Sequence, residues 1–152
     1  MRDPDYLPEE KREKTEHKAR PLSQQKTKFT KLVREKSLTA LKHLAYDDLE
    51  SFLAQFAQND TEGNAWTRAR LDPIIDSYFD EEHHSMRLDP EARNTKHTQI
   101  DDSTENNQWK VTQIICDPDE KNDWAITFLV DLEASDQLEM PVFTLESLKS
   151  IH

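Results

Sequence analysis

The sequence contains a single glycine, Gly63, among its 152 residues. Glycine-rich phosphate loops, the Walker A motif and the dinucleotide-binding fingerprint each need glycines at fixed spacings, because their backbone approaches the phosphates closely. None of these motifs can be built around Gly63 alone. The sequence therefore argues against a nucleotide-driven enzyme.

Cysteine and long apolar runs are equally scarce. The one cysteine, Cys116, leaves no internal disulfide and no cysteine-rich zinc site, and we expect it to be a small buried hydrophobic residue. No apolar stretch reaches the roughly 18 residues that a membrane span needs, and the N-terminus lacks the apolar core of a signal peptide. We therefore expect a cytoplasmic protein without a membrane segment.

Charge is abundant and unevenly placed. Apolar residues make up 34% of the chain and charged residues another 34%, with a net charge of −11. Residues 1–43 hold 12 Lys or Arg against 7 Asp or Glu, and residues 44–152 hold 8 against 24. This asymmetry predicts a basic arm on an acidic body. The acidic body repels phosphate, which disfavours direct nucleic-acid binding by residues 44–152.

Two alternating segments, residues 108–117 and 123–131, give the strongest structural signal. Side chains alternate between the two faces of a strand, so Trp109, Val111 and Ile115 share one face of the first segment. The second segment places Trp124 and three further apolar residues on one face. The intervening residues 118–122 are typical of a turn. The pattern predicts an antiparallel hairpin with one face packed on another layer.

Helices are predicted before the hairpin. Apolar residues recur at helical spacing from Ser23, a candidate N-cap, to Leu44, and again over residues 49–56. The intervening Tyr46-Asp47-Asp48 fits a helix break or a cap. A third helix covers residues 71–79. Pro73 fits its first turn if Asp72 is the cap, or causes a kink if the helix begins at Thr67.

The remaining segments complete an α+β domain. Residues 95–100 fit a short edge strand, residues 134–139 a turn, and residues 141–145 the start of a last strand. We expect three N-terminal helices packed on a curved antiparallel sheet of three to four strands, in an order shared with cone-shaped folds such as nuclear transport factor 2. Residues 1–22 are predicted to be a disordered charged arm and residues 23–152 a single domain.

Five short blocks carry a family resemblance. They are Arg87–Arg93, Trp109–Ile114, Asp117–Pro118, Asn122–Trp124 and Val130–Leu132. In order and spacing they resemble the domain of unknown function at the C-terminus of bacterial superfamily II helicases of the DEAD/DEAH-box type. The resemblance covers roughly residues 31–152.

This resemblance implies an accessory domain without its motor. The chain shows no Walker A loop, acidic DExx box or arginine-bearing helicase motif, so no catalytic residue of the helicase is carried over. The resemblance is compatible with a free-standing protein, a separately encoded subunit or the remnant of a truncated gene.

Two clusters invite a metal interpretation. In Glu81-Glu82-His83-His84 the adjacent histidines point about 100° apart on a helix rather than converging as an i, i+4 pair would. A solvated helix terminus is the preferred interpretation. The residues Asp117, Asp119 and Asp123 resemble a calcium loop, but Asn122 and Phe128 stand where that loop needs Gly and Glu. We therefore expect turn capping, and predict no metal site and no cofactor.

Three further sets of residues are candidates for binding or catalysis. The tryptophans Trp66, Trp109 and Trp124 are expected in the core rather than stacked on bases, because stacking platforms lie in positive grooves. A basic segment is the candidate contact for nucleic acid or a partner, with the polar face of an amphipathic helix as the competing interpretation. It consists of Lys26, Lys28, Lys31, Arg34 and Lys36. A catalytic pocket would have to draw on Tyr46, Asp47, Tyr78 and Asp131, whose spacing selects no catalytic set.

The sequence thus predicts a non-enzymatic accessory or protein-interaction domain associated with a DEAD/DEAH-box RNA helicase. Its expected partner is a helicase motor or another protein, with weak nonspecific RNA contact through the basic segment. The alternative is a small-ligand-binding or isomerase-like domain with a pocket between helices and sheet.

Overall fold

The computed structural model describes residues 20–151 as helices packed on one face of a four-stranded antiparallel sheet. Its helical elements are η1 (Leu22–Gln24), α2 (Lys26–Ala45), α3 (Leu49–Ala54), α4 (Arg68–Asp80), η2 (Thr95–His97) and α5 (Leu132–Leu138). Its strands are β1 (Thr98–Asp101), β2 (Gln108–Ile115), β3 (Trp124–Asp131) and β4 (Phe143–Ser150). The predicted α+β class is confirmed.

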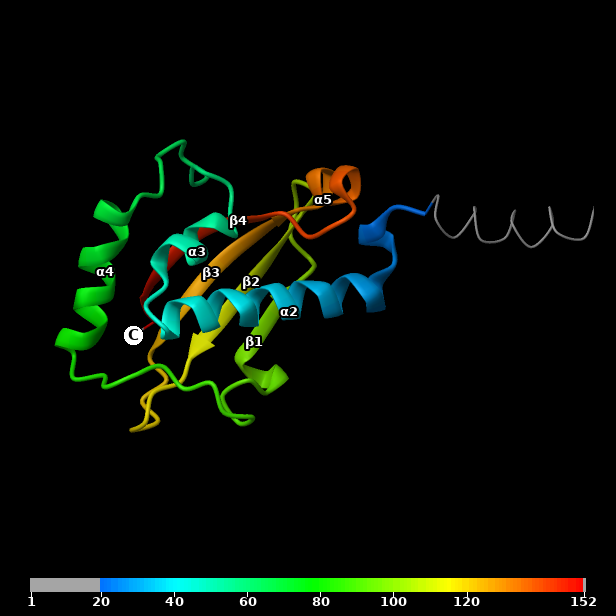
Figure 1. The fold of residues 1–152 in the computed structure, drawn as a ribbon. Helices are drawn as coiled ribbons and strands as arrows, with labels where there is room; N and C mark the ends of the chain where they lie inside the picture. Colours follow the sequence, from blue (N-terminus) through cyan, green and yellow to red (C-terminus); the bar gives the residue numbers. More distant parts are fainter. Residues whose placement is uncertain (1–19, 152) are drawn as a thin grey trace, which may run out of the picture.

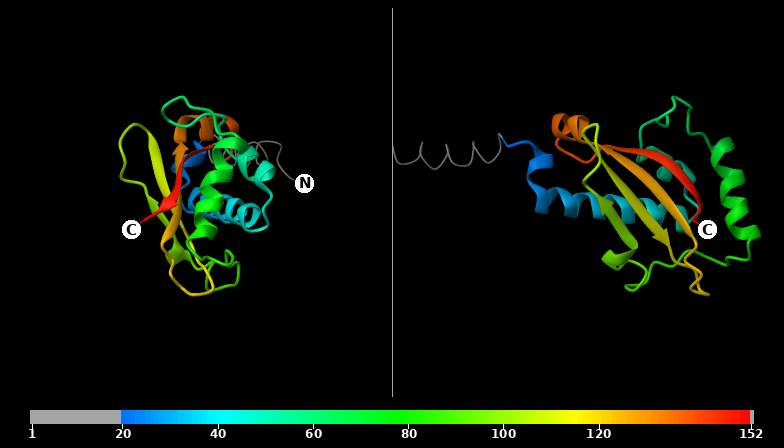
Figure 2. Two further views of the ribbon diagram at one scale, coloured as in Figure 1. Left: turned by 90° about the vertical axis from the view of Figure 1, so that its left-hand side faces the viewer. Right: turned by 180° about the vertical axis from the view of Figure 1, so that it is seen from behind.

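The sheet follows the order of the chain, β1-β2-β3-β4, and every neighbouring pair is antiparallel. The predicted hairpin is confirmed, with Trp109 opposite Val130 and Ile115 opposite Trp124. β1 is the edge strand expected near residues 95–100. Figure 1 shows α2 and α3 lying over one face of the sheet, and Figure 2 shows the opposite face uncovered.

The core lies between α2, α3 and the covered face of the sheet. Phe29 of α2 meets Trp109 edge-on, with ring centroids 4.9 Å apart. Phe56, just after α3, stacks on Phe128 at 5.2 Å, and Phe128 lies 5.0 Å from Phe143. The three tryptophans are all buried, as predicted. This aromatic row joins the helices to three strands and removes a large apolar area from water.

The first residues of the helices can be compared with the capping residues that the sequence predicts. Asp48 caps α3, accepting a hydrogen bond from the backbone N–H of Ser51, as the sequence suggested. Thr67 caps α4, so of the two alternatives the earlier start is the observed one and Pro73 lies inside the helix. Ser23 is not the cap of α2. It belongs to η1, and its N–H and hydroxyl donate to the Asp136 carboxylate of α5.

The prediction of a turn at residues 134–139 is wrong. It forms most of α5, which Asp131 caps by accepting a hydrogen bond from the N–H of Ala134. The helix is only seven residues long and polar, so its own sequence gives little periodic signal. Contacts to Ser23, distant in the sequence, help to hold it.

The predicted arm falls mostly outside the described residues. Its last residue, Leu22, is 7% exposed and already packs into the core. Within the described residues, no helix is both long and apolar enough to cross a membrane.

Candidate functional site

The five basic residues of the candidate contact do not converge on one face of α2. Lys28 and Lys31 are exposed on the side of the helix away from the core. Lys26 is exposed near the start of α2, where its Nζ lies 2.8 Å from a carboxylate oxygen of Asp102. Arg34 and Lys36 are half-buried. At about 100° per residue, these last two lie on opposite borders of the buried face.

The surroundings of Lys36 and Arg34 are those of packed side chains. The Lys36 ammonium lies 5.5 Å from the centroid of the Phe143 ring, and burial lowers the pKa of this lysine. The buried Nε of Arg34 has no hydrogen-bond partner among the described residues. Both side chains are partly buried, so the predicted set divides into exposed and packed members.

The outward face of α2 contains functional candidates that the sequence interpretation missed. Lys42 follows Lys28 and Lys31 on this face, because the three positions lie within about 60° of one another around the helix. Next to Lys42 opens a groove of about 340 Å³. Its lining residues are Leu38, Thr39, Lys42, Tyr46, Leu88 and Arg93. The exposed Tyr46 ring therefore lines the same groove as two cations, Lys42 and Arg93. Helical periodicity could have found Lys42, whereas Arg93 reaches the groove only through the tertiary fold.

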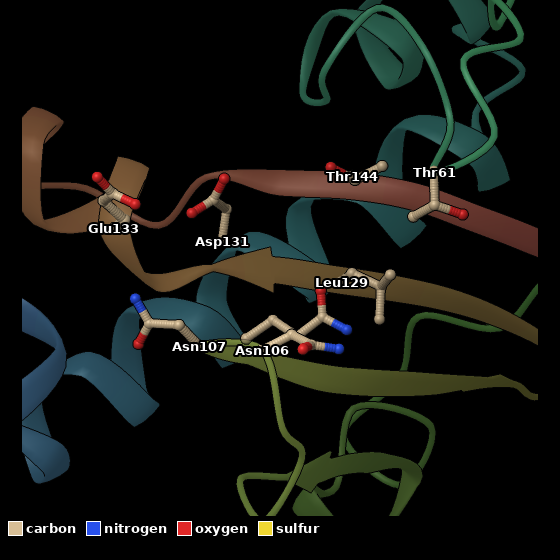
Figure 3. Close-up of a pocket in the computed structure, with 8 residues that line it drawn as sticks. Thr61, Asn106, Asn107, Leu129, Asp131, Glu133 and Thr144 are labelled. Carbon is tan, nitrogen blue, oxygen red and sulfur yellow. The ribbon is translucent and has the colours of Figure 1, made fainter.

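A second cavity, of about 240 Å³, opens on the uncovered face of the sheet. Figure 3 shows residues that line it, among them Asn106, Asn107, Leu129, Asp131 and Glu133. The carboxylate of Asp131 also caps α5. This cavity is a surface depression on the open side of the sheet, away from the core.

The polar residues that a catalytic pocket would have to use lie apart. Tyr46 and Asp47 are exposed at the end of α2, where Tyr46 lines the groove beside Lys42, whereas Asp131 lines the separate cavity on the sheet. Tyr78 is fully buried, and its hydroxyl donates to the carbonyl of Ser85 over 2.8 Å. Burial, together with nearby acidic groups, raises the pKa of Tyr78 well above its usual value. These residues have no common cavity in which to act together.

The environment of His83 corrects the prediction of a solvated helix terminus. His84 is exposed, but His83 is only 3% exposed and stacks on the Tyr78 ring at 4.2 Å. Its Nδ1 lies 2.7 Å from the Tyr78 carbonyl oxygen, and its Nε2 lies 2.7 Å from Oδ1 of Asp123. Burial by itself would lower the pKa of His83, but the hydrogen bonds to Asp123 and Tyr78 and the nearby carboxylates raise it.

Glu81 completes a compact group with this pair. Its Oε2 accepts a hydrogen bond from the indole Nε1 of Trp124 over 2.5 Å. One ligand atom each from Glu81, His83 and Asp123 lies within 4.8 Å of the others. The sequence concealed this group because Asp123 is 40 residues from His83 and comes beside it only when β3 packs against α4.

The prediction of turn capping in the acidic turn before β3 is confirmed for Asp117 but not for Asp123. Asp117 is 1% exposed and accepts hydrogen bonds from the N–H groups of Asn122 and Asp119. It is therefore a turn cap, whereas Asp123 pairs with His83. Cys116 is buried as expected. Burial raises the pKa of its thiol, which disfavours the thiolate.

Comparison with known proteins gives one match. No curated protein and no solved structure matches the chain. Residues 1–148 match the family described as a domain of unknown function, DUF3516. The match covers nearly the whole chain, including all five blocks that carry the resemblance. The chain therefore belongs to the DUF3516 family.

Proposed function

We propose that this chain is a non-catalytic accessory domain that docks onto a partner protein, the motor of a DEAD/DEAH-box RNA helicase. The link to a bacterial helicase, and with it a cytoplasmic location, rests on the resemblance of residues 31–152. The supporting structural observation is a closed interior combined with exposed apolar side chains at the surface. This combination is typical of an interaction module.

The closed interior lies between the helices and the covered face of the sheet. Phe29, Val33 and Leu41 of α2 are fully buried against Val111 and Phe128 of the sheet. The two cavities described above both lie outside this layer. The alternative of a small-ligand-binding or isomerase-like domain requires space there, with polar groups converging on it. The packing favours the interaction module.

Two of the exposed apolar side chains lie close together in the sequence, where α5 turns into β4. Leu138 is 63% exposed and Met140 is 50% exposed, and between them Glu139 has a left-handed backbone conformation. Two large apolar side chains, side by side on a tight turn, offer a compact anchor for a hydrophobic pocket of a partner. We assign this pair as the docking point for the motor.

The docking proposal is tested with the full chain and the separately purified helicase motor. Biolayer interferometry should detect binding, and a Leu138→Ser/Met140→Ser double variant should weaken it by at least about tenfold. An Ile151→Ser variant is the matched control, because Ile151 is also an exposed apolar residue but follows the last residue of β4. Absence of binding, or equal loss in the control, would refute this docking point.

A second candidate function, contact with single-stranded RNA, is favoured by the groove on the outward face of α2. A base can stack on the exposed Tyr46 ring while phosphates meet Lys42 and Arg93, and Lys28 and Lys31 extend the cationic surface along the helix. The acidic remainder of the chain opposes this attraction. Binding should therefore be weak, independent of sequence and steeply dependent on salt.

Fluorescence anisotropy with a labelled oligoribonucleotide tests the RNA contact. Affinity should fall steeply between about 50 mM and about 200 mM salt. A Lys42→Glu/Arg93→Glu variant should abolish binding, and Tyr46→Ala should weaken it. Lys149→Glu, which reverses an exposed charge on the far side of the sheet, should change it little. Binding that is insensitive to salt would contradict the proposal.

A further inference from the structure

We propose that Glu81, His83 and Asp123 form a binding site for a divalent transition metal ion, with zinc the best match. The site joins the end of α4 to the residue that precedes β3. This inference is independent of the proposed docking and RNA-binding functions.

The orientation of the His83 ring is the first observation that carries the proposal. Nδ1 lies 2.7 Å from the Tyr78 carbonyl oxygen, which can only accept, so Nδ1 must carry a proton. The 2.7 Å contact between Nε2 and the Asp123 carboxylate needs a proton on Nε2 as well in the metal-free chain. When that proton is lost, the lone pair of Nε2 faces the two carboxylates. Metal-bound histidines are usually held in this way, with the other ring nitrogen donating to a carbonyl or carboxylate.

The carboxylates supply the second observation. Asp123 Oδ1 lies 2.7 Å from Nε2, and Oε2 of Glu81 is held by the indole N–H of Trp124. Ligand atoms of a zinc ion lie roughly 3.3 Å apart when each is about 2.0–2.2 Å from the metal. To bind zinc, the Asp123 oxygen therefore has to move about half an ångström away from Nε2 of His83, and the Glu81 oxygen has to move toward it. The 25% exposure of the Asp123 side chain leaves a path for the ion.

The composition of the site selects the metal. One imidazole nitrogen and two carboxylates neutralise a divalent charge, and zinc accepts three protein ligands with water in the remaining position. Calcium and magnesium prefer sites made of oxygen ligands alone. Metal binding replaces the hydrogen bond between Nε2 and Asp123, so one proton leaves His83 as the ion enters.

Titration of the metal-free full chain with zinc chloride in a calorimeter tests the site. We expect saturable binding of one ion per chain, release of a proton, and a rise in Tm that a chelator reverses. Cobalt(II) should bind in the same place and give visible absorption bands that report its coordination. Absence of saturable binding up to about 1 mM zinc would overturn the proposal.

Variants separate this site from adventitious binding. Glu81→Gln should weaken zinc binding by at least about tenfold without loss of folding, because Glu81 is exposed. Asp123→Asn and His83→Gln should weaken it further, with circular dichroism reporting whether each variant is folded. The neighbouring exposed residues provide the controls, Glu82→Gln and His84→Gln, which should bind zinc as the parent does. Equal affinity in Glu81→Gln and the parent, or loss of binding in the His84→Gln control, would refute the assignment.

Discussion

The hydroxyl of Ser37 on α2 donates a hydrogen bond of 2.7 Å to the side-chain oxygen of Gln113 on β2, and both residues are fully buried. Thr98 of β1 donates to the same oxygen over 2.6 Å. The Gln113 amide group in turn donates to the carbonyls of His97 and Ile114. A single glutamine thus connects the main helix to two strands inside an apolar layer. Buried polar groups with all partners in place fix one arrangement of such elements.

Replacing this glutamine should be costly. Gln113→Leu keeps the volume but leaves the hydroxyls of Ser37 and Thr98 buried and unpaired, so we expect the free energy of unfolding to fall by about 2–3 kcal/mol. Urea denaturation measures this loss. The triple variant Ser37→Ala/Thr98→Val/Gln113→Leu should regain part of it, because all three polar groups are then absent. A triple variant less stable than Gln113→Leu would contradict this account.

Asp117 should make stability depend on acid pH. Burial alone would raise the pKa of its carboxyl, but hydrogen bonds from the backbone N–H groups of residues 119, 121 and 122 outweigh burial and lower the pKa. The ionised carboxylate therefore contributes stability above its unfolded pKa of about 3.9, and this contribution disappears as the pH falls through the lower folded value.

The comparison with Asp117→Asn isolates this contribution. We expect the variant to be less stable than the parent at neutral pH by about 2 kcal/mol, because a charged acceptor is replaced by a neutral one. The difference should shrink as the pH falls below about 4. Urea denaturation at several pH values from neutral downward measures it. A difference that does not change with pH would show that the carboxylate charge is irrelevant.

Trp66 should stabilise the contact between α4 and β4. Its indole N–H donates to the carbonyl of Leu145 over 2.7 Å, and the Arg70 guanidinium lies 3.7 Å from the centroid of its ring. Trp66→Phe removes the hydrogen bond from a buried carbonyl, so we expect a loss of about 1–2 kcal/mol by thermal or urea unfolding. An unchanged transition midpoint would mean that water or a shifted side chain replaces the indole as hydrogen-bond donor to the Leu145 carbonyl.

Glu139 has φ 56° at the end of α5, in the left-handed region that favours glycine. Glu139→Gly should therefore raise the free energy of unfolding by about 0.5–1 kcal/mol. Glu133→Gly is the matched control, because residue 133 lies in the first turn of the same helix. There the same change should lower the free energy of unfolding. Thermal unfolding compares the two variants with the parent. A loss of stability in Glu139→Gly would show that the glutamate side chain has a role of its own.

The sequence by itself determined the local elements with strong periodic signals. Alternation placed Trp109, Val111 and Ile115 on one face of β2, because the period of a strand is fixed by its pleat. Helical spacing located α2 and α3, and the short polar side chain of Asp48 marked the start of α3. These features depend on residues within a few positions of one another, so a single chain contains the information needed to predict them.

The tertiary structure decided what depends on residues far apart in the chain. The sequence predicts a solvated helix terminus at His83 and offers no partner for Gln113 on the apolar face of β2. Both are nevertheless buried, because partners 40 and 76 residues away satisfy their hydrogen bonds. Packing likewise separated Arg34 and Lys36 from Lys28 and Lys31, and brought Arg93 beside Tyr46 and Lys42. Charge and burial depend on such neighbours, and only the fold determines which neighbours a side chain has.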